Sequence, residues 1–274
     1  MSGGFKRLIP FSIVSLLLLT NLFPLGWMVI TSLRPEGKII SDQTRLIPED
    51  ISLDNFREVW QSGPFARYSF NSILVTSVVI LTNIGFSSMV GYAFARGRFW
   101  GKEILFGFIV ASLMIPKQVL IIPIFILMHK MGLINTYFAL ILPFCCDGFN
   151  IFLMRQYIQS LPLDLEDAAR LDGASEAGLL FRIVMPLARP ALAVVAINTA
   201  LVTWNAVLYP LILTSTDEMR TLPVGLALYS HGPHSVDWGH LMAGSSLACL
   251  PILIVFLAFQ RHIIAGITAG ATKG

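Results

Sequence analysis

Long uncharged apolar runs dominate the pattern of hydrophobic and polar positions along this chain of 274 residues. Four runs contain no Asp, Glu, Lys or Arg, and each exceeds the roughly 20 residues that a helix needs to cross a bilayer. Two further runs carry one charge each, Lys117 in the first and Asp147 in the second. The pattern therefore predicts six membrane-spanning helices, at about 8–33, 68–95, 104–128, 131–154, 190–216 and 238–260.

Composition supports the same class of fold. Charged residues make up 13% of the chain, whereas an ordinary soluble domain carries about 25%. The three cysteines fall inside the expected spans, which indicates small packing residues. A net charge of +3 without a basic stripe gives no sign of a nucleic-acid partner. We expect an all-α, polytopic protein of the cell membrane, whose first apolar run is too long for a cleaved signal peptide.

The distribution of Lys and Arg between the loops predicts the orientation. With both termini in the cytoplasm, eleven of these residues lie in the cytoplasmic segments and seven lie outside. Five of the seven fall in one longer loop, where the positive-inside rule has less weight. This assignment makes the cytoplasmic segments 1–7, 96–103, 155–189 and 261–274.

The external loops hold two candidate features. The first loop, about 34–67, contains a short amphipathic helix candidate at Leu53–Trp60. The loop after the fifth span contains His231, His234 and His240, which could bind a metal. Because acidic or cysteine ligands at suitable spacing are missing, we interpret them as solvated loop histidines and expect no metal site.

Signatures of common enzymes are absent from the sequence. Gly37-Lys38 is followed by Ile39 and Gly101-Lys102 by Glu103, so neither pair belongs to a phosphate-binding loop of the G-x-x-x-x-G-K-[ST] type. The patterns H-E-x-x-H and G-x-S-x-G do not occur either. We therefore expect no catalytic residues and no cofactor in this chain.

The cytoplasmic segment at about 160–189 stands out because it is charged between two apolar spans. Ser160 before Pro162 indicates a helix start, and Gly173 breaks that helix. Ser175 can cap a second helix. The apolar spacing is formed in the first helix by Leu161, Leu165, Ala168 and Ala169, and in the second by Ala177, Leu180, Phe181 and Val184. The segment therefore predicts a helix, a glycine turn and a second helix that ends near Pro186 and Pro190.

This segment also contains a specific motif. Asp167-Ala168-Ala169, three residues, Gly173, nine residues and Ile183-Val184-Met185-Pro186 resemble the E-A-A-x3-G-x9-I-x-L-P loop of ABC importer permeases. Asp replaces Glu at 167 and Met replaces Leu at 185, which keeps charge and apolarity.

Further stretches resemble the carbohydrate-uptake branch, and in particular the shorter permease of maltose-type systems. They are Leu33-Arg34-Pro35, Asn71-Ser72, Tyr92-Ala93-Phe94-Ala95-Arg96, Leu133-Ile134-Asn135-Thr136, Arg155-Gln156, Thr221-Leu222-Pro223-Val224-Gly225-Leu226, Asp237-Trp238-Gly239 and 268–274. One departure is Ala206, which follows Trp204-Asn205 where the family usually has an acid.

The resemblance implies a division of labour between several chains. A binding protein outside the membrane delivers the solute, this chain and a second permease form the pathway, and two cytoplasmic ATPase subunits bind ATP and Mg²⁺. The charged segment would then be the coupling loop that docks on the ATPase. The implied coupling residues are Glu166, Asp167, Ala168, Ala169, Asp172 and Gly173. The alternative, a pair of amphipathic helices lying on the membrane surface, would leave Arg182 and Arg189 as headgroup anchors.

Polar residues within the spans are the candidates for the solute pathway. Asp147 and Asn150 follow Pro143, where the helix could be irregular and face a water-filled cavity. A hydrogen bond or an ion pair with another span is an equal alternative. Trp204 and Asn205 could stack on a sugar ring and bind it by hydrogen bonds, whereas packing between helices is the alternative.

The function expected from these features is an ATP-driven importer permease for a saccharide, glycoside or polyol. Glycerol phosphate or another small polar solute is the alternative within the same class. A stand-alone secondary transporter would need acids inside the spans to couple ions, and Asp147 is the one Asp or Glu there. A membrane scaffold without a transport role is the remaining alternative.

Overall fold

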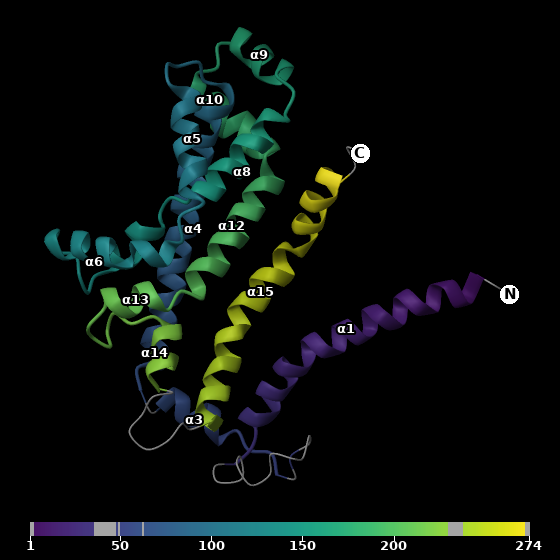
Figure 1. The fold of residues 1–274 in the computed structure, drawn as a ribbon, viewed down its shortest axis with the longest axis vertical. Helices are drawn as coiled ribbons and strands as arrows, with labels where there is room; N and C mark the ends of the chain where they lie inside the picture. The colour runs from purple at the N-terminus through teal and green to yellow at the C-terminus, as the bar shows by residue number, and fades with distance from the viewer. Residues whose placement is uncertain (1–2, 36–47, 49, 62, 230–237, 272–274) are drawn as a thin grey trace. The chain divides into compact units, whose positions relative to one another are not determined.

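The computed structural model describes residues 3–35, 48, 50–61, 63–229 and 238–271. Within these ranges the chain is helical without a strand, which confirms the all-α expectation (Figure 1). His231, His234 and residues 272–274 lie outside the described residues. The helices are α1 (Gly3–Ser32), α3 (Asp54–Gln61), α4 (Phe65–Arg96), α5 (Lys102–Ser112), η1 (Lys117–Leu120), α6 (Ile121–Lys130), α7 (Tyr137–Ile141), η2 (Leu142–Phe144), α8 (Gly148–Gln159), α9 (Asp164–Leu171), α10 (Glu176–Leu179), η3 (Leu180–Val184), α11 (Met185–Leu187), α12 (Arg189–Trp204), α13 (Leu208–Leu213), α14 (Leu222–Tyr229) and α15 (Trp238–Ala271).

Three of these helices are individually long and apolar enough to cross a membrane. They contain the stretches Pro10–Ser32 in α1, Phe65–Arg96 in α4 and Trp238–Leu257 in α15. The number reaches six if each of three bent helix pairs counts as one span. The chain is therefore a multi-pass membrane protein with three to six candidate spans in its described part.

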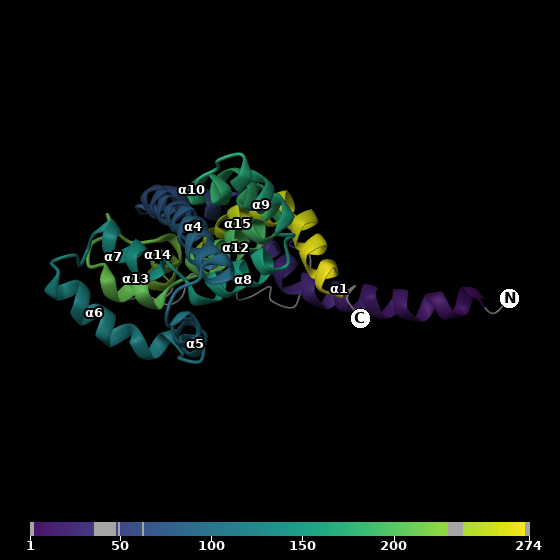
Figure 2. The same ribbon diagram turned by 90° about the horizontal axis from the view of Figure 1, so that it is seen from above.

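The remaining expected spans are interrupted. The helix expected at 104–128 is divided between α5 and α6, which turn by 95° (Figures 1 and 2). The one expected at 131–154 is replaced by α7 with η2 and by α8, with a bend of 44°. In place of the helix expected at 190–216, α12 ends at Trp204, and α13 starts after a gap of three residues. Proline accounts for part of this, because Pro116 precedes η1 and Pro143 lies within η2.

The described helices fall into two compact units, residues 1–67 with 225–250 and residues 68–224 with 251–274. In the first unit, the side-chain amide of Asn55 on α3 donates to the carbonyl oxygens of Ser32 and Arg34, at 2.8 and 2.7 Å. This helix fulfils the expectation of a short helix near 53–60. His240 corrects another expectation, because it is buried at the start of α15 with its Nε2 2.6 Å from Glu58 Oε2.

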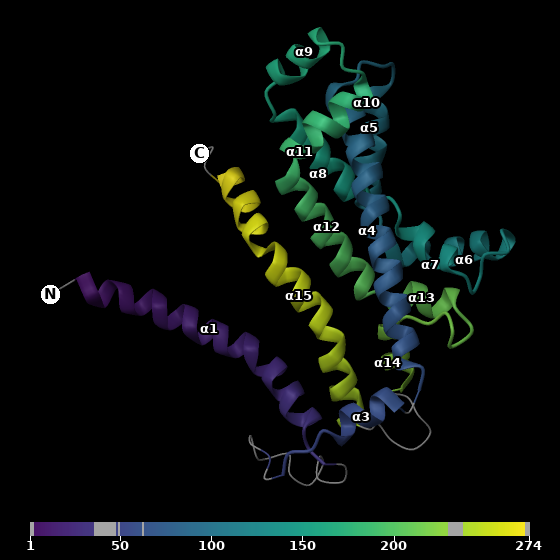
Figure 3. The same cartoon turned by 180° about the vertical axis from the view of Figure 1, so that it is seen from behind.

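In the second unit, α4 runs beside α8 and α12 (Figures 1 and 3). A Cβ added to Gly91 on α4 would lie 2.8 Å from the Cβ of Met154 on α8, so glycine is what permits this close approach. The shared core is apolar and reaches into the segment after α9. Its buried members are Tyr92, Met154, Ile158, Leu180, Val184, Ala188, Ala191 and Val195.

Candidate functional site: a charged loop and an intramembrane polar cluster

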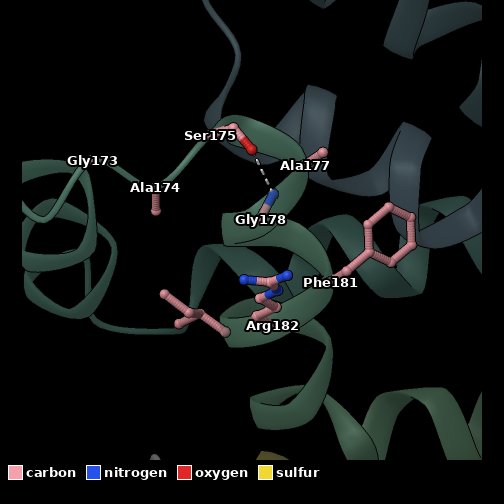
Figure 4. Close-up of a pocket in the computed structure, with 8 residues that line it drawn as sticks. Gly173, Ala174, Ser175, Ala177, Gly178, Phe181 and Arg182 are labelled. Atoms are coloured by element: carbon pink, nitrogen blue, oxygen red, sulfur yellow. Dashed lines mark hydrogen bonds between the residues drawn. The ribbon is translucent and has the colours of Figure 1, made fainter.

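The loop between α8 and α12 contains the expected helix, glycine turn and second helix at one end of α4 (Figures 1 and 3). Gly173 adopts a φ of +85°, which L-residues other than Asn and Asp rarely take. The hydroxyl of Ser175 accepts a hydrogen bond from the amide of Gly178 at 3.2 Å and caps α10 (Figure 4). Ser160, in contrast, ends α8, and α9 begins at Asp164.

The second helix buries two of the four residues of the expected face, Leu180 and Val184, whereas Ala177 is exposed. Leu179, Leu180 and Val184 are buried, whereas Phe181 is exposed. A π-helical segment, η3, covers Leu180–Val184. One π turn takes up an additional residue, so the residues beyond it rotate out of the 3.6-residue register.

Glu166 is the buried anchor of α9. Its side chain is 2% exposed, and its Oε1 accepts a hydrogen bond from Arg96 Nε at 2.8 Å. Its second oxygen lies 3.4 Å from the Tyr92 hydroxyl and 3.7 Å from Arg170 Nη2. The carboxylate is thus engaged within the chain, contrary to the expectation that it faces a partner.

Most of the other implied coupling residues are accessible. The side chain of Asp167 is 66% exposed and pairs with Arg170 at 3.0 Å. Ala168, Asp172 and Gly173 are exposed, and Ala169 is half-buried. The structure therefore brings four of the six implied residues to the surface of the loop, leaves Ala169 half-buried and turns Glu166 inward.

A groove of about 560 Å³ lies immediately beside the glycine turn (Figure 4). It runs from Gly173 along α10 to Ile183, and Phe181 and Arg182 supply its larger side chains. The small residues at its start, Ala174, Ala177 and Gly178, leave the backbone accessible.

Glu176 joins the loop's two halves. Its Oε2 accepts a hydrogen bond from Tyr92 at 2.8 Å, and its Oε1 accepts one from Arg170 at 3.2 Å. The hydrogen bond from Tyr92 is the main reason that the pKa of Glu176 lies below its ordinary value, and the Arg170 contact acts in the same direction. The charged form of Glu176 is therefore the one that the folded loop stabilises.

Asp147 occupies the break before α8. Its Oδ1 accepts a hydrogen bond from the Phe149 amide at 2.9 Å and caps α8, and its Oδ2 lies 2.5 Å from Lys117 Nζ. Lys117 stands at the break between α5 and α6, and Tyr209 donates to its carbonyl oxygen at 2.6 Å. Both side chains line an open groove of about 650 Å³. The ion-pair alternative is thus realised, and it lies beside an accessible cavity.

Asn150 lies at the centre of a buried polar cluster. Its amide nitrogen donates to Asn83 Oδ1 and Thr199 Oγ1, both at 3.0 Å, and its oxygen accepts from Asn198 at 3.1 Å. Asn83 in turn donates to the Phe144 carbonyl oxygen at 2.6 Å. The cluster joins α4, α8 and α12 and was not recognised from the sequence, where only Asn150 stood out.

The last two candidates lie at the end of α12. Trp204 is buried. Asn205 is exposed, caps the end of α12 and donates to the Leu201 carbonyl oxygen at 2.9 Å. Trp204 therefore packs within the chain, whereas Asn205 presents polar atoms at the gap before α13.

Together these features define an all-α, polytopic membrane protein with a structured charged loop and polar residues at its helix breaks. Comparison with known proteins identifies the family of this chain. The family model described as the inner membrane component of binding-protein-dependent transport systems matches residues 83–269. The chain belongs to this family, which confirms the resemblance found in its sequence.

Individual relatives match over nearly the whole chain. The arabinooligosaccharides transport system permease protein AraQ of Halalkalibacterium halodurans is 40% identical over 92% of this chain and 91% of its own. The trehalose/maltose transport system permease protein MalG of Thermococcus litoralis is 33% identical over 98% of both. A solved structure of a bacterial ABC transporter that imports alginate has a TM-score of 0.83 at 24% identity, covering 96% of this chain and 98% of that one. The last comparison supports the fold.

Proposed function

We propose that this chain is a permease subunit of an ATP-driven importer for a saccharide or a related polyhydroxy solute. Its similarity over nearly its full length to permeases named for arabinooligosaccharides and for trehalose and maltose carries this proposal. The family's description supports delivery of the solute by a binding protein outside the membrane. The family of the chain makes it a transport component.

The proposed assembly contains further chains. A second permease completes the pathway, and two ATPase subunits in the cytoplasm bind ATP and Mg²⁺. The loop between α8 and α12 supports this arrangement, because it presents Asp167, Asp172 and the turn at Gly173 outward. The carboxylates offer charge-assisted hydrogen bonds to cationic side chains of an ATPase, and the groove beside the turn admits a close approach.

The proposed pathway runs past the helix breaks. Asp147 and Asn205 are polar, are accessible at interruptions of the expected spans, and are therefore assigned to contact with the solute. Asn150 and Trp204 are buried behind them and shape the wall. Non-helical backbone at membrane depth needs protein or water around it, which fits a pathway between two permeases.

The solute class is tested with the complete transporter complex, purified and placed in proteoliposomes together with its binding protein. We expect neutral oligosaccharides to stimulate ATP hydrolysis and to accumulate inside. If glycerol phosphate alone stimulated ATP hydrolysis, the solute would be an anionic one instead of a saccharide. Uptake driven by an ion gradient, without ATPase chains, would refute the importer.

The coupling role of the loop is tested at Gly173 and Asp172. A β-branched residue at Gly173 is strained by about 1–2 kcal/mol because of the positive φ, whereas Asn tolerates it. We expect Gly173→Val and Asp172→Arg to separate ATP hydrolysis from solute movement. The Gly173→Asn variant separates the two possible causes of a defect. Asn tolerates the positive φ of the turn but adds a side chain at the surface that would contact the ATPase. Normal stimulation and uptake in the Val and Arg variants would revive the interfacial-helix alternative.

A further inference from the structure

The helix α9 is held in place by charged and polar contacts, chiefly to α4, instead of by apolar packing. Of its eight residues, all of them described, Glu166 is the buried one. The apolar side chains of α9 point elsewhere, and Leu171 is 90% exposed. Polar contacts are directional, so α9 is held in one orientation by the buried Glu166 carboxylate together with the exposed Arg170, which donates to Glu176 on α10.

Those partners stand at the end of α4, one helical turn apart. Arg96, the last residue of α4, donates from Nε to Glu166 at 2.8 Å and from Nη2 to the Leu161 carbonyl oxygen at 2.9 Å. Tyr92 donates to Glu176 on α10 at 2.8 Å. Two residues of α4 therefore contact both halves of the loop, one on each side of the glycine turn.

The helix α4 differs from the loop's other neighbours in its continuity. It runs unbroken for 32 residues, whereas α8 follows a bend of 44° and α12 follows one of 82°. A displacement at Arg96 therefore moves α4 as a rod, while the same displacement can be absorbed at the breaks of the other helices. Asn83, in the polar cluster with Asn150, lies 13 residues before Arg96, or about 20 Å along the helix.

We propose that Tyr92 and Arg96 are positioning residues that transmit movement of the coupling loop to α4. The Arg96–Glu166 pair, with side chains 10% and 2% exposed, fixes α9 to the helix end, and the Tyr92–Glu176 bond fixes α10. Movement of the loop then shifts Asn83 and the polar cluster near the middle of the same rod. This inference rests on the proposed coupling function of the loop.

The test uses the complete complex in lipid, with its ATPase chains and loaded binding protein. The variants are Arg96→Gln, Glu166→Gln, the charge-swapped pair Arg96→Glu with Glu166→Arg, and the milder Tyr92→Phe. Matched controls are Asp164→Asn, an exposed acid on the same helix, and Arg98→Gln, an exposed base just beyond α4. Three quantities are measured: bound ATPase chains, basal hydrolysis, and hydrolysis stimulated by the loaded binding protein.

We expect Arg96→Gln and Glu166→Gln to retain the ATPase chains and basal hydrolysis, because the outward face of the loop is unchanged. Stimulated hydrolysis and uptake should fall by about tenfold, within the usual range of coupling between two sites. The charge-swapped pair should recover part of the loss. Tyr92→Phe should lose less, and the controls should remain within about twofold of the wild type, as expected for exposed positions.

Stimulation at the level of the controls in Arg96→Gln and Glu166→Gln would overturn the inference. So would the same loss in the charge-swapped pair as in the single variants, because a merely structural defect is not restored by reversing both charges. If Arg96→Gln fails to assemble, Tyr92→Phe decides, and normal stimulation in its assembled complex overturns the proposal. Normal coupling in Gly173→Val and Asp172→Arg would instead refute the proposed function of the loop.

Discussion

Asn150 shows how one residue can connect three helices in a membrane. Its side chain bonds with Asn83 on α4, Asn198 and Thr199 on α12, and is itself buried. Lipid offers no replacement partner for a polar group that loses its bond. Asn150→Leu should therefore lower the free energy of unfolding by about 1–3 kcal/mol, the typical penalty for leaving buried groups unpaired. Thermal unfolding of the purified complex measures this loss.

Asn205→Leu is the matched control, since Asn205 is exposed and bonds within its own helix. It should change stability by less than about 0.5 kcal/mol. If Asn205 contacts the solute, uptake falls in this variant while stability remains. Equal stability of Asn150→Leu and the wild type would show that the cluster does not hold the helices together.

Asp147 combines two roles that substitutions can separate. It caps α8 through the Phe149 amide and forms an ion pair with Lys117. Asp147→Asn keeps the cap and loses the charge, whereas Asp147→Ala loses both and about 1 kcal/mol of stability with the cap. We expect the Asp147→Asn and Lys117→Met variants to be abundant but to transport poorly, which uptake per assembled complex measures. Normal uptake by the Asp147→Asn variant would mean that Asp147 acts only as the N-cap of α8.

The polar residues within the spans and the buried acid of the loop differ in how far the sequence could reveal them. Asp147 and Asn150 are polar within apolar runs, so their local surroundings were enough to single them out. Glu166 is one of several acids in a charged stretch, and its burial depends on Arg96, which lies 70 positions earlier. Contacts over such separations leave no trace in helical periodicity, so the sequence suggested an outward role for Glu166.

At the scale of elements, hydropathy located the apolar segments but not their interruptions. A window average does not change when a helix turns by 95° between α5 and α6. Proline does not resolve the question either. Pro10 and Pro24 lie inside α1 and Pro251 inside α15 without ending these helices, whereas Pro116 and Pro143 mark breaks. Residue type alone therefore does not distinguish a proline at which a helix breaks from one that the helix accommodates.

The same limit applies within the loop. Capping chemistry is local, so Ser175 and Gly173 were identified correctly from their residue types. The π-helical η3 is not signalled by residue type, and the exposure of Ala177 and Phe181 was not predicted either. The cap at Ser175 and the turn at Gly173 were thus predictable, whereas the start of α9 and the buried face of the second helix were not.

The loop as an element should respond to acid through Glu176. The pKa of this carboxyl is below its ordinary value of 4.5 in the folded loop, mainly because of the Tyr92 hydrogen bond. A lowered pKa means that the unfolded state binds the proton more readily, so Glu176 stabilises the folded loop above pH 4.5 and this contribution is lost as pH falls further. Amide exchange of residues 176–184 between about pH 7 and pH 4, corrected for intrinsic rates, should show additional opening at the acid end.

Glu176→Gln provides the comparison, because its amide does not titrate. We expect the variant to be less protected near neutral pH and to show a smaller change on acidification. An identical pH profile in both proteins would mean that the Tyr92 and Arg170 contacts do not stabilise the loop.

At the scale of the whole molecule, the broken helices and the exposed apolar side chains have a common explanation. Breaks near Lys117, Asp147 and Asn205 interrupt the regular helical hydrogen bonds, and lipid offers backbone groups at such breaks no partners. Many apolar side chains of α1, α5 and α6 are exposed in this single chain. Both features fit a subunit whose surroundings are lipid on some faces and a second permease with an aqueous pathway on others.

The orientation of the whole molecule is the prediction on which the assignment of the loop depends. With both termini inside, eleven of the Lys and Arg residues fall in cytoplasmic segments and seven outside, so the loop around Gly173 faces the ATPase side. Ala177 borders the groove of the loop, and Ser215 is exposed between α13 and α14. After replacement of Cys145, Cys146 and Cys249, Ala177→Cys should react with an impermeant thiol reagent only in inverted vesicles, and Ser215→Cys only in intact cells. Labelling of both from the same side would place an even number of crossings between them and would separate the loop from any cytoplasmic ATPase.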